Sequence, residues 1–135
     1  MAEAPPSASA LLESARALLP RSAAPYSRFR VAALLESEDG SAHPGVNVES
    51  VSYGLSMCAE RNALFGAIAR GVTRFRRLAL VSETMRPVLP CGACRQVLLE
   101  YAPGLVLLVE RPAGPPEEIP LADLLPRAFT EFKPR

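Results

Sequence analysis

Two short apolar runs on either side of a helix-like segment most constrain how this chain can fold. The runs are RRLALVS at residues 76–82 and LVLLVE at residues 105–110, and CGACRQVLLEYAPG at residues 91–104 lies between them. The second run is short and unbroken, as expected of a strand in a sheet that is covered on both faces. Strands joined through a helix need a crossover connection, which makes them parallel. The sequence therefore predicts a sheet that is parallel in part.

Further helices and strands are predicted by apolar periodicity and by turn signals such as Asp39-Gly40, which favours a hairpin. They are helices over residues 9–19 and 55–71, strands over residues 28–36 and 45–53, and a short edge strand with a helical turn over residues 119–129. The predicted fold class is α/β, a three-layer α/β/α sandwich with a mixed sheet of about five strands. The length predicts a single domain over residues 1–135.

The charge balance argues against a polyanionic partner. The chain carries 15 basic and 14 acidic side chains, a formal net charge of +1, and no run of like charges stands out. A protein that binds nucleic acid usually shows a basic patch or a strongly basic balance. The expected partner is therefore a small neutral ligand and not nucleic acid.

The sequence also lacks the features of a membrane or exported protein. It has nothing close to the roughly 18 consecutive apolar residues of a membrane span. The N-terminal segment has apolar residues at helical spacing and no basic region before an apolar block. The default location is therefore the cytoplasm, where thiols stay reduced. There, a CxxC motif favours metal binding or catalysis over a structural disulfide.

The three cysteines stand at the predicted starts of two helices. Cys58 opens the helix predicted in the segment MCAERNAL, and Cys91 and Cys94 open the following helix. Two helices that each follow a strand can present their N-termini at one edge of a sheet, which would bring the three sulfurs together. Three thiolates form a zinc ligand set, and a catalytic zinc keeps its fourth position for water. Helix N-termini carry partial positive charge, which favours the thiolate form.

Glu60 lies two residues after Cys58, where the helix is only beginning. On a mature helix, residues i and i+2 point in different directions, so the two side chains converge only if Cys58 lies at the first turn. There Glu60 could reach the water of a catalytic zinc without binding the metal, which is the position of a proton shuttle. Arg61 is a candidate for compensating the charge of three thiolates.

Two other interpretations of the cysteines stay open at this point. A CxxC motif between a strand and a helix also describes a thioredoxin-like redox site, although that interpretation leaves Cys58 and Glu60 unexplained. A closed structural zinc would need a fourth ligand, which His43, the single histidine, could supply. His43 precedes Pro44 in a predicted turn, where a solvated side chain is the commoner outcome.

The motifs CAER at residues 58–61 and PCGACRQ at residues 90–96 resemble those of the zinc-dependent cytidine deaminases. The wider deaminase signature is H-x-E followed by P-C-x-x-C, with the glutamate as acid and base. Here a cysteine, Cys58, stands in the first ligand position. In this respect the sequence resembles the small homotetrameric nucleoside deaminases of the three-cysteine type. The resemblance covers about residues 11–129. It implies the cytidine deaminase fold, Zn²⁺ bound by Cys58, Cys91 and Cys94, and Glu60 as the catalytic acid and base.

The resemblance also implies a set of substrate contacts. FRVAAL at residues 29–34 is similar to the family's first strand, GVNVES at residues 45–50 to its ribose-binding segment, and LLPRAF at residues 124–129 to a C-terminal segment that crosses a subunit interface. The residues implied are Phe29 beside the base, Asn47 and Glu49 at the ribose, Tyr53 and Phe129 at a neighbouring subunit's site, and Arg61 on the zinc thiolates. The backbone N–H of Ala59 is expected to help hold the base.

Some of these residues also make physical sense without the family. Asn47 and Glu49, two apart on a predicted strand, would face the same side and offer a donor and acceptors to a vicinal diol. For Phe29 and Phe129, packing into the core is the alternative interpretation.

The expected reaction is the hydrolytic deamination of cytidine and 2′-deoxycytidine to uridine and 2′-deoxyuridine, with release of ammonia, in pyrimidine salvage. A blasticidin-type aminonucleoside deaminase shares the Cys-Ala-Glu and PCGxCRQ patterns, although the NVES segment argues against it. A non-enzymatic structural zinc module is the alternative from a different class. The expected partners are a nucleoside substrate and further copies of this chain, in a homotetramer with shared active sites, and no membrane.

Overall fold

The computed structural model describes residues 4–84 and 86–132. Residues 1–3, 85 and 133–135, which the single-domain prediction includes, lie outside the described part of the chain. The helices are α1 (Ala8–Arg16), α2 (Ala59–Ala69) and α3 (Gly92–Tyr101), and the strands are β1 (Val31–Ser37), β2 (Ala42–Val46), β3 (Phe75–Ser82), β4 (Val106–Val109) and β5 (Glu117–Pro120), with short 3₁₀ helices at Leu19–Arg21, Tyr53–Leu55 and Leu121–Leu124.

The strands form one five-stranded sheet in the order β2-β1-β3-β4-β5. β3 and β4 are parallel, with Leu78 opposite Leu107, and every other neighbouring pair is antiparallel. Because α3 forms the crossover between β3 and β4, the strand–helix–strand prediction is confirmed. β5 lies at the edge of the sheet and leads into a helical turn, as predicted for the C-terminal segment.

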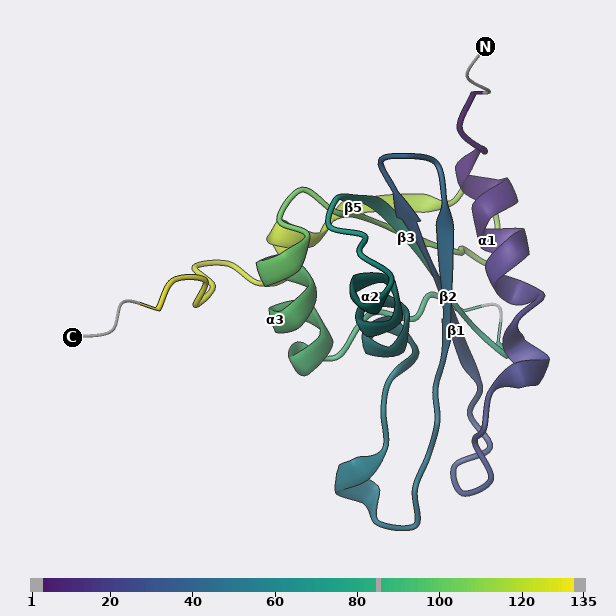
Figure 1. Cartoon of the computed structure of the whole chain (residues 1–135). Helices are drawn as coiled ribbons and strands as arrows, with labels where there is room; N and C mark the ends of the chain where they lie inside the picture. The colour runs from purple at the N-terminus through teal and green to yellow at the C-terminus, as the bar shows by residue number, and fades with distance from the viewer. Residues whose placement is uncertain (1–3, 85, 133–135) are drawn as a thin grey trace.

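The helices lie on both faces of the sheet, which confirms the three-layer α/β/α prediction. In Figure 1, α1 covers one face, and α2 and α3 lie together on the other. Side chains of a strand alternate between the two faces. In β3, Ala79 and Val81 pack in the cluster with α1, whereas Leu78 and Leu80 pack in the cluster with α2 and α3. Burial of apolar surface on both faces therefore holds the sheet at the centre of the molecule.

The hairpin between β1 and β2 has the turn that the Asp39-Gly40 signal predicts. The backbone N–H of Gly40 donates to Ser37 O at 3.1 Å, and Gly40 has a φ of 90°. That left-handed conformation is readily adopted by glycine. Asp39 Oδ1 accepts from the backbone N–H of Ser41 at 2.9 Å, and hydrogen bonds from Ser37 and Ser41 hold the pKa of Asp39 well below its usual range.

The returning strand begins earlier and is shorter than predicted. The sequence pattern predicts a strand over residues 45–53, whereas β2 spans Ala42–Val46. The tight turn sets the register, so Glu36 already pairs with Ala42. Pro44, which has no N–H, is tolerated because β2 is an edge strand. Beyond Val46 the chain makes isolated bridges from Val48 to Ala23 and to Met57. The region 47–52 is therefore a loop on this edge and not a strand.

The predicted helices are present but are shorter than expected. α1 ends at Arg16, and a separate 3₁₀ turn, which contains Pro20, spans Leu19–Arg21. α2 begins at Ala59, because Tyr53–Leu55 forms its own turn and Cys58 has an extended conformation. None of the helices in the described ranges has the length and apolar character of a bilayer span.

Candidate active site

The three cysteines lie where two helices begin. Cys58 is the N-cap of α2, with φ −73° and ψ 152°, and Cys91 is the N-cap of α3, with φ −67° and ψ 167°. Cys94 follows in the first turn of α3. The first N–H groups of a helix have no partners within the helix and carry partial positive charge. Both helix ends therefore favour negative charge at these sulfurs.

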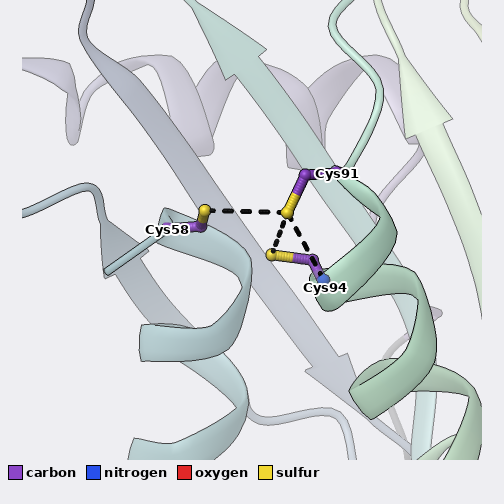
Figure 2. Close-up of side chains that lie close together, drawn as sticks. All are labelled: Cys58, Cys91 and Cys94. Atoms are coloured by element: carbon purple, nitrogen blue, oxygen red, sulfur yellow. Dashed lines mark hydrogen bonds between the residues drawn. The ribbon is translucent and has the colours of Figure 1, made fainter. Parts of the chain in front are cut away.

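The sulfurs of Cys58, Cys91 and Cys94 all lie within 4.8 Å of one another. Figure 2 shows the three side chains pointing toward a common centre, Cys58 from α2 and the other two from α3. Sγ of Cys91 is 3.9 Å from Sγ of Cys58 and 3.5 Å from Sγ of Cys94. The prediction that the fold brings the three sulfurs together is confirmed.

These distances fit a zinc site. Zinc–sulfur bonds of about 2.3 Å in tetrahedral geometry place the sulfurs about 3.8 Å apart, a value between the two observed distances. A disulfide would need a separation of about 2 Å, and all three cysteines are free. The sulfurs are therefore spaced as ligands of one ion.

The charges around the sulfurs also favour a cation. Burial and the nearby Glu60 carboxylate raise the pKa of the Cys94 thiol. Hydrogen bonds, led by the one from the backbone N–H of Cys94, lower the pKa of Cys91 although burial opposes them. Arg61 Nη2 donates to Cys58 Sγ at 3.5 Å, which raises the pKa of the Arg61 guanidinium. The positive charge of Arg61 offsets only part of the negative charge of three thiolates, and a divalent cation would offset more of it.

Glu60 is buried and lies next to Cys94 of this cluster. It is the second residue of α2 and is only 5% exposed. Burial raises the pKa of its carboxyl group, and a side-chain hydrogen bond with Cys94 and the charge of Arg61 oppose that rise. Ala59, between Cys58 and Glu60, is fully buried. A buried carboxyl group that touches a sulfur cluster can exchange protons with a reacting molecule held there.

Asn47 lies just beyond β2 and connects three segments. Its Oδ1 accepts from the backbone N–H of Val31 at 2.9 Å and from Ser22 Oγ. Its Nδ2 donates to Phe29 O at 2.8 Å. An amide nitrogen has two N–H donors, so one remains for another acceptor. The expectation that Asn47 and Glu49 share a strand face is wrong, because β2 ends at Val46.

Glu49 holds the loop that leads into β1. Its Oε1 accepts from the backbone N–H groups of Tyr26 and Ser27 at 3.1 Å and 3.0 Å, and its Oε2 accepts from Ser27 Oγ. The hydrogen bonds from Ser27 are the main cause that lowers the pKa of Glu49. Its carboxylate therefore stays ionised and keeps lone pairs for another donor.

The three aromatic residues implied by the resemblance are all exposed. The exposed fractions are 43% for Phe29, 78% for Tyr53 and 67% for Phe129. The alternative that Phe29 and Phe129 pack into the core is therefore wrong. In Figure 1 the loop around Tyr53–Leu55 and the segment after Leu125 both extend away from the body of the molecule. The side chains of Tyr53 and Phe129, which these two segments carry, are therefore open to solvent.

His43 does not join the cysteines. It lies within β2 opposite Leu35 and is only 7% exposed, so neither a turn nor a solvated side chain describes it. Its Nε2 is 3.0 Å from Ser41 Oγ. Among the residues described, the group able to hold a metal consists of the three cysteines alone. The strand pairing, which the sequence pattern missed, explains the position of His43.

His43→Ala is expected to leave zinc binding unchanged, because His43 bonds to the hairpin and not to the cluster. Thermal stability should fall, since the change removes a buried side chain. Metal analysis of the purified variant should give about one zinc per chain. A variant that folds and has lost its zinc would instead support the closed structural site, in which His43 is the fourth zinc ligand.

Sequence reasoning assigned no role to Gly45 or to Ser22. A Cβ on Gly45 would lie 2.2 Å from Ala59 O and 2.5 Å from Ala63 N, so Gly45 lets β2 approach α2 closely. A glycine within a strand pattern is a signal of such an approach. No sequence signal marks Ser22, which meets Asn47 only through the folded chain.

The comparisons with known proteins agree with this geometry. Residues 6–110, which include all three cysteines, match the family model of the cytidine and deoxycytidylate deaminase zinc-binding region. The cytidine deaminase of Halalkalibacterium halodurans is 49% identical over 107 residues, which is 78% of this chain and 81% of that protein. The cytidine deaminase of Mycobacterium tuberculosis H37Rv is 46% identical over 105 residues, which is 78% of this chain and 76% of that protein.

Solved structures extend the likeness to the whole fold. The crystal structure of cytidine deaminase from Burkholderia pseudomallei superposes with a TM-score of 0.85 at 45% identity, over 92% of this chain and all of that one. The crystal structure of the Mycobacterium tuberculosis cytidine deaminase has a TM-score of 0.79 at 38% identity, over 90% of this chain and 95% of that one. Motif, metal-ligand geometry and fold lead to one conclusion: the chain belongs to the cytidine and deoxycytidylate deaminase family.

Proposed function

We propose that this chain is a zinc-dependent hydrolase that converts cytidine and 2′-deoxycytidine, with water, to uridine and 2′-deoxyuridine and ammonia. The observation that carries the proposal is the buried carboxyl group of Glu60 beside a cluster of three free cysteines at two helix N-termini. The chemistry of the relatives, which are cytidine deaminases, and the near-neutral charge of the chain support a nucleoside over a nucleic acid.

Cys58, Cys91 and Cys94 would hold the zinc ion, and Arg61 would offset part of the thiolate charge. When bound, zinc supplies a Lewis acid that makes water acidic enough to attack a ring carbon at neutral pH. The two helix N-termini add partial positive charge at the same sulfurs.

Glu60 would move the protons of the reaction. Its carboxylate would accept a proton from the water that attacks C4 of the ring and deliver it to N3. It would then take the second proton of that oxygen and pass it to the amino group, which leaves as ammonia when the C4–N bond breaks. Glu60 is buried, which raises the pKa of its carboxyl group. The backbone N–H of Ala59, which lies between Cys58 and Glu60, would help hold the base.

Asn47 and Glu49 would bind the ribose hydroxyl groups. Asn47 offers the N–H that its three contacts leave over, and Glu49 offers an acceptor. Phe29 would lie against the base. Because Asn47 also bonds to Phe29 O, the ribose and base contacts would be held in one rigid unit.

We further propose a homotetramer with shared active sites. The exposed side chains of Tyr53 and Phe129, on segments that leave the body of the molecule, support it. Each would complete the substrate pocket of a neighbouring copy. The free cysteines support work in a reducing compartment, the cytoplasm.

Phe129→Ala is expected to raise KM for cytidine by about tenfold. This corresponds to a loss of roughly 1.4 kcal/mol of binding free energy when the aromatic contact is removed. kcat should change little, because Phe129 would contact the base and not the reacting atoms. Phe132→Ala on the same segment is the matched control, since Phe132 is also exposed. Unchanged kinetics for Phe129→Ala would remove this residue from the site.

The proposal is tested directly by mixing zinc-loaded protein with cytidine and following the loss of cytidine absorbance as uridine forms. Turnover at a typical enzymatic rate, on the order of 1 per second or faster, is the expected result. A folded, zinc-loaded protein that leaves cytidine unchanged would overturn it. Blasticidin S, assayed in parallel, decides whether the aminonucleoside alternative then applies.

A further inference from the structure

Arg95, one turn into α3, holds the loop that carries a metal ligand. Its Nε donates to Pro90 O at 2.8 Å. Pro90 is buried and directly precedes Cys91. A buried carbonyl needs a hydrogen-bond partner, and Arg95 supplies it from the helix that begins at Cys91. The approach of the chain to the sulfur cluster is thus tied to the body of α3.

The same turn of α3 also holds the C-terminal segment. Arg95 Nη1 donates to Leu124 O at 3.1 Å, and Gln96 Nε2 donates to Phe129 O at 2.6 Å. Between these two bonds, Arg127 has a φ of 55°, a left-handed conformation that is unfavourable for a residue other than glycine. Such a conformation persists only where its surroundings enforce it.

Packing alone holds this segment weakly. Leu125 and Ala128 are only partly buried against the core, and the Phe129 side chain is exposed. Figure 1 shows the segment leaving the body of the molecule beside α3. The side-chain bonds from Arg95 and Gln96 therefore supply much of what defines its path.

We infer that Arg95 and Gln96 are positioning residues. They attach both the chain just before Cys91, at Pro90, and the backbone at Phe129 to the same helix, α3. Their donors bind three carbonyl groups, those of Pro90, Leu124 and Phe129. For the reaction, the inference rests on the proposed function, in which Phe129 enters the site of a neighbouring copy. The segment that a neighbour receives would then be held by the helix that also carries two metal ligands.

The test of the Gln96 contact is limited trypsin digestion of the zinc-loaded protein, followed by mass spectrometry for cleavage after Arg127. Gln96→Met keeps the side-chain length but removes the N–H donor. In this variant, the C-terminal segment should be cut after Arg127 about tenfold faster than in the unsubstituted chain, because cleavage follows local release of the chain. Tyr101→Phe, an exposed change on the same helix, is the control and should be cut at the unsubstituted rate. A Gln96→Met rate within about threefold of that of the unsubstituted chain overturns the inference.

The Arg95 contact has a separate readout that does not depend on activity. Arg95→Lys keeps the charge but lacks the planar fork that reaches both Pro90 O and Leu124 O. Zinc release to a chelator should be about fivefold faster in this variant and unchanged in Gln96→Met. Equal release rates in Arg95→Lys and the unsubstituted chain overturn the role of Arg95.

Kinetics then connect the positioning residues to the reaction. Gln96→Met should raise KM for cytidine by about fivefold with kcat within about twofold, the pattern of a lost binding contact. An unchanged KM overturns the link to the neighbouring site. If the unsubstituted chain does not deaminate cytidine, the proposed function fails, while trypsin cleavage and zinc release still decide whether Arg95 and Gln96 hold these segments.

Discussion

Glu60→Gln is expected to lower kcat for cytidine by about four orders of magnitude, which is roughly 5 kcal/mol of the activation barrier. Glutamine has the same shape but cannot accept and release the protons that the reaction moves. Four orders of magnitude is the upper end for one acid–base group, and we expect it because Glu60 would handle more than one proton transfer. Zinc content should stay unchanged, since the proposed ligands are the three cysteines.

The Glu60→Gln variant should also fold normally. Burial raises the pKa of Glu60, which means that the fold disfavours its charged form, and a neutral glutamine avoids that cost. The measurement is steady-state kinetics together with metal analysis and a thermal melt. A variant that keeps zinc, melts normally and retains a tenth or more of kcat, about 1.4 kcal/mol from the original barrier, would show that another group moves the protons.

Gly45→Ala is expected to damage both the fold and the site. The added Cβ would lie 2.2 Å from Ala59 O, 2.5 Å from Ala63 N and 2.8 Å from Ala63 Cβ. Two of these atoms belong to the backbone of α2, so a side-chain rotation cannot relieve the contact, and the helix must move away from β2. Overpacking of this kind costs about 3 kcal/mol, which corresponds to a fall of roughly 10 °C in Tm.

The consequence for the site follows from the position of Ala59 between Cys58 and Glu60. A shift of the first turn of α2 moves a proposed metal ligand and the proposed proton shuttle relative to Cys91 and Cys94. A misplacement of about 1 Å lowers rates by roughly a hundredfold. Faster zinc loss to a chelator and a lower kcat/KM should therefore accompany the fall in Tm.

Gly104→Ala is the matched control for Gly45→Ala. A Cβ at Gly104 would meet nothing within 4 Å, and its φ lies outside the left-handed region. Its Tm, zinc retention and kinetics should equal those of the unsubstituted chain. If Gly45→Ala behaves in the same way as this control, the close approach of β2 to α2 does not position the site.

Elements with strong local signals could be predicted from the sequence. The unbroken run in β4, the apolar periodicity of α1 and the Asp39-Gly40 turn each depend on neighbouring residues, and each is present in the structure. The crossover between β3 and β4 followed from the helix between two strands. Boundaries were less predictable, because the ends of β2 depend on pairing with β1 and on its place at the sheet edge.

The sequence by itself determined which residues are the candidates for the chemistry of this protein. Cys58, Glu60, Cys91 and Cys94 could be selected from their spacing and from their place at two helix starts, because helix N-termini favour thiolates and three thiolates suit zinc. These are properties of residue types and of short segments, which need no knowledge of the surrounding fold.

Only the tertiary structure decided how those residues are held. Gly45 lies in β2 and is separated from α2 by a loop, yet it sets how closely α2 meets the sheet. Ser22 meets Asn47, and Gln96 meets Phe129 O, across separations of 25 and 33 residues. His43 is buried because β2 pairs with β1. Such contacts follow from the packing of layers against one another, and that packing cannot be predicted from the local periodicity of the sequence.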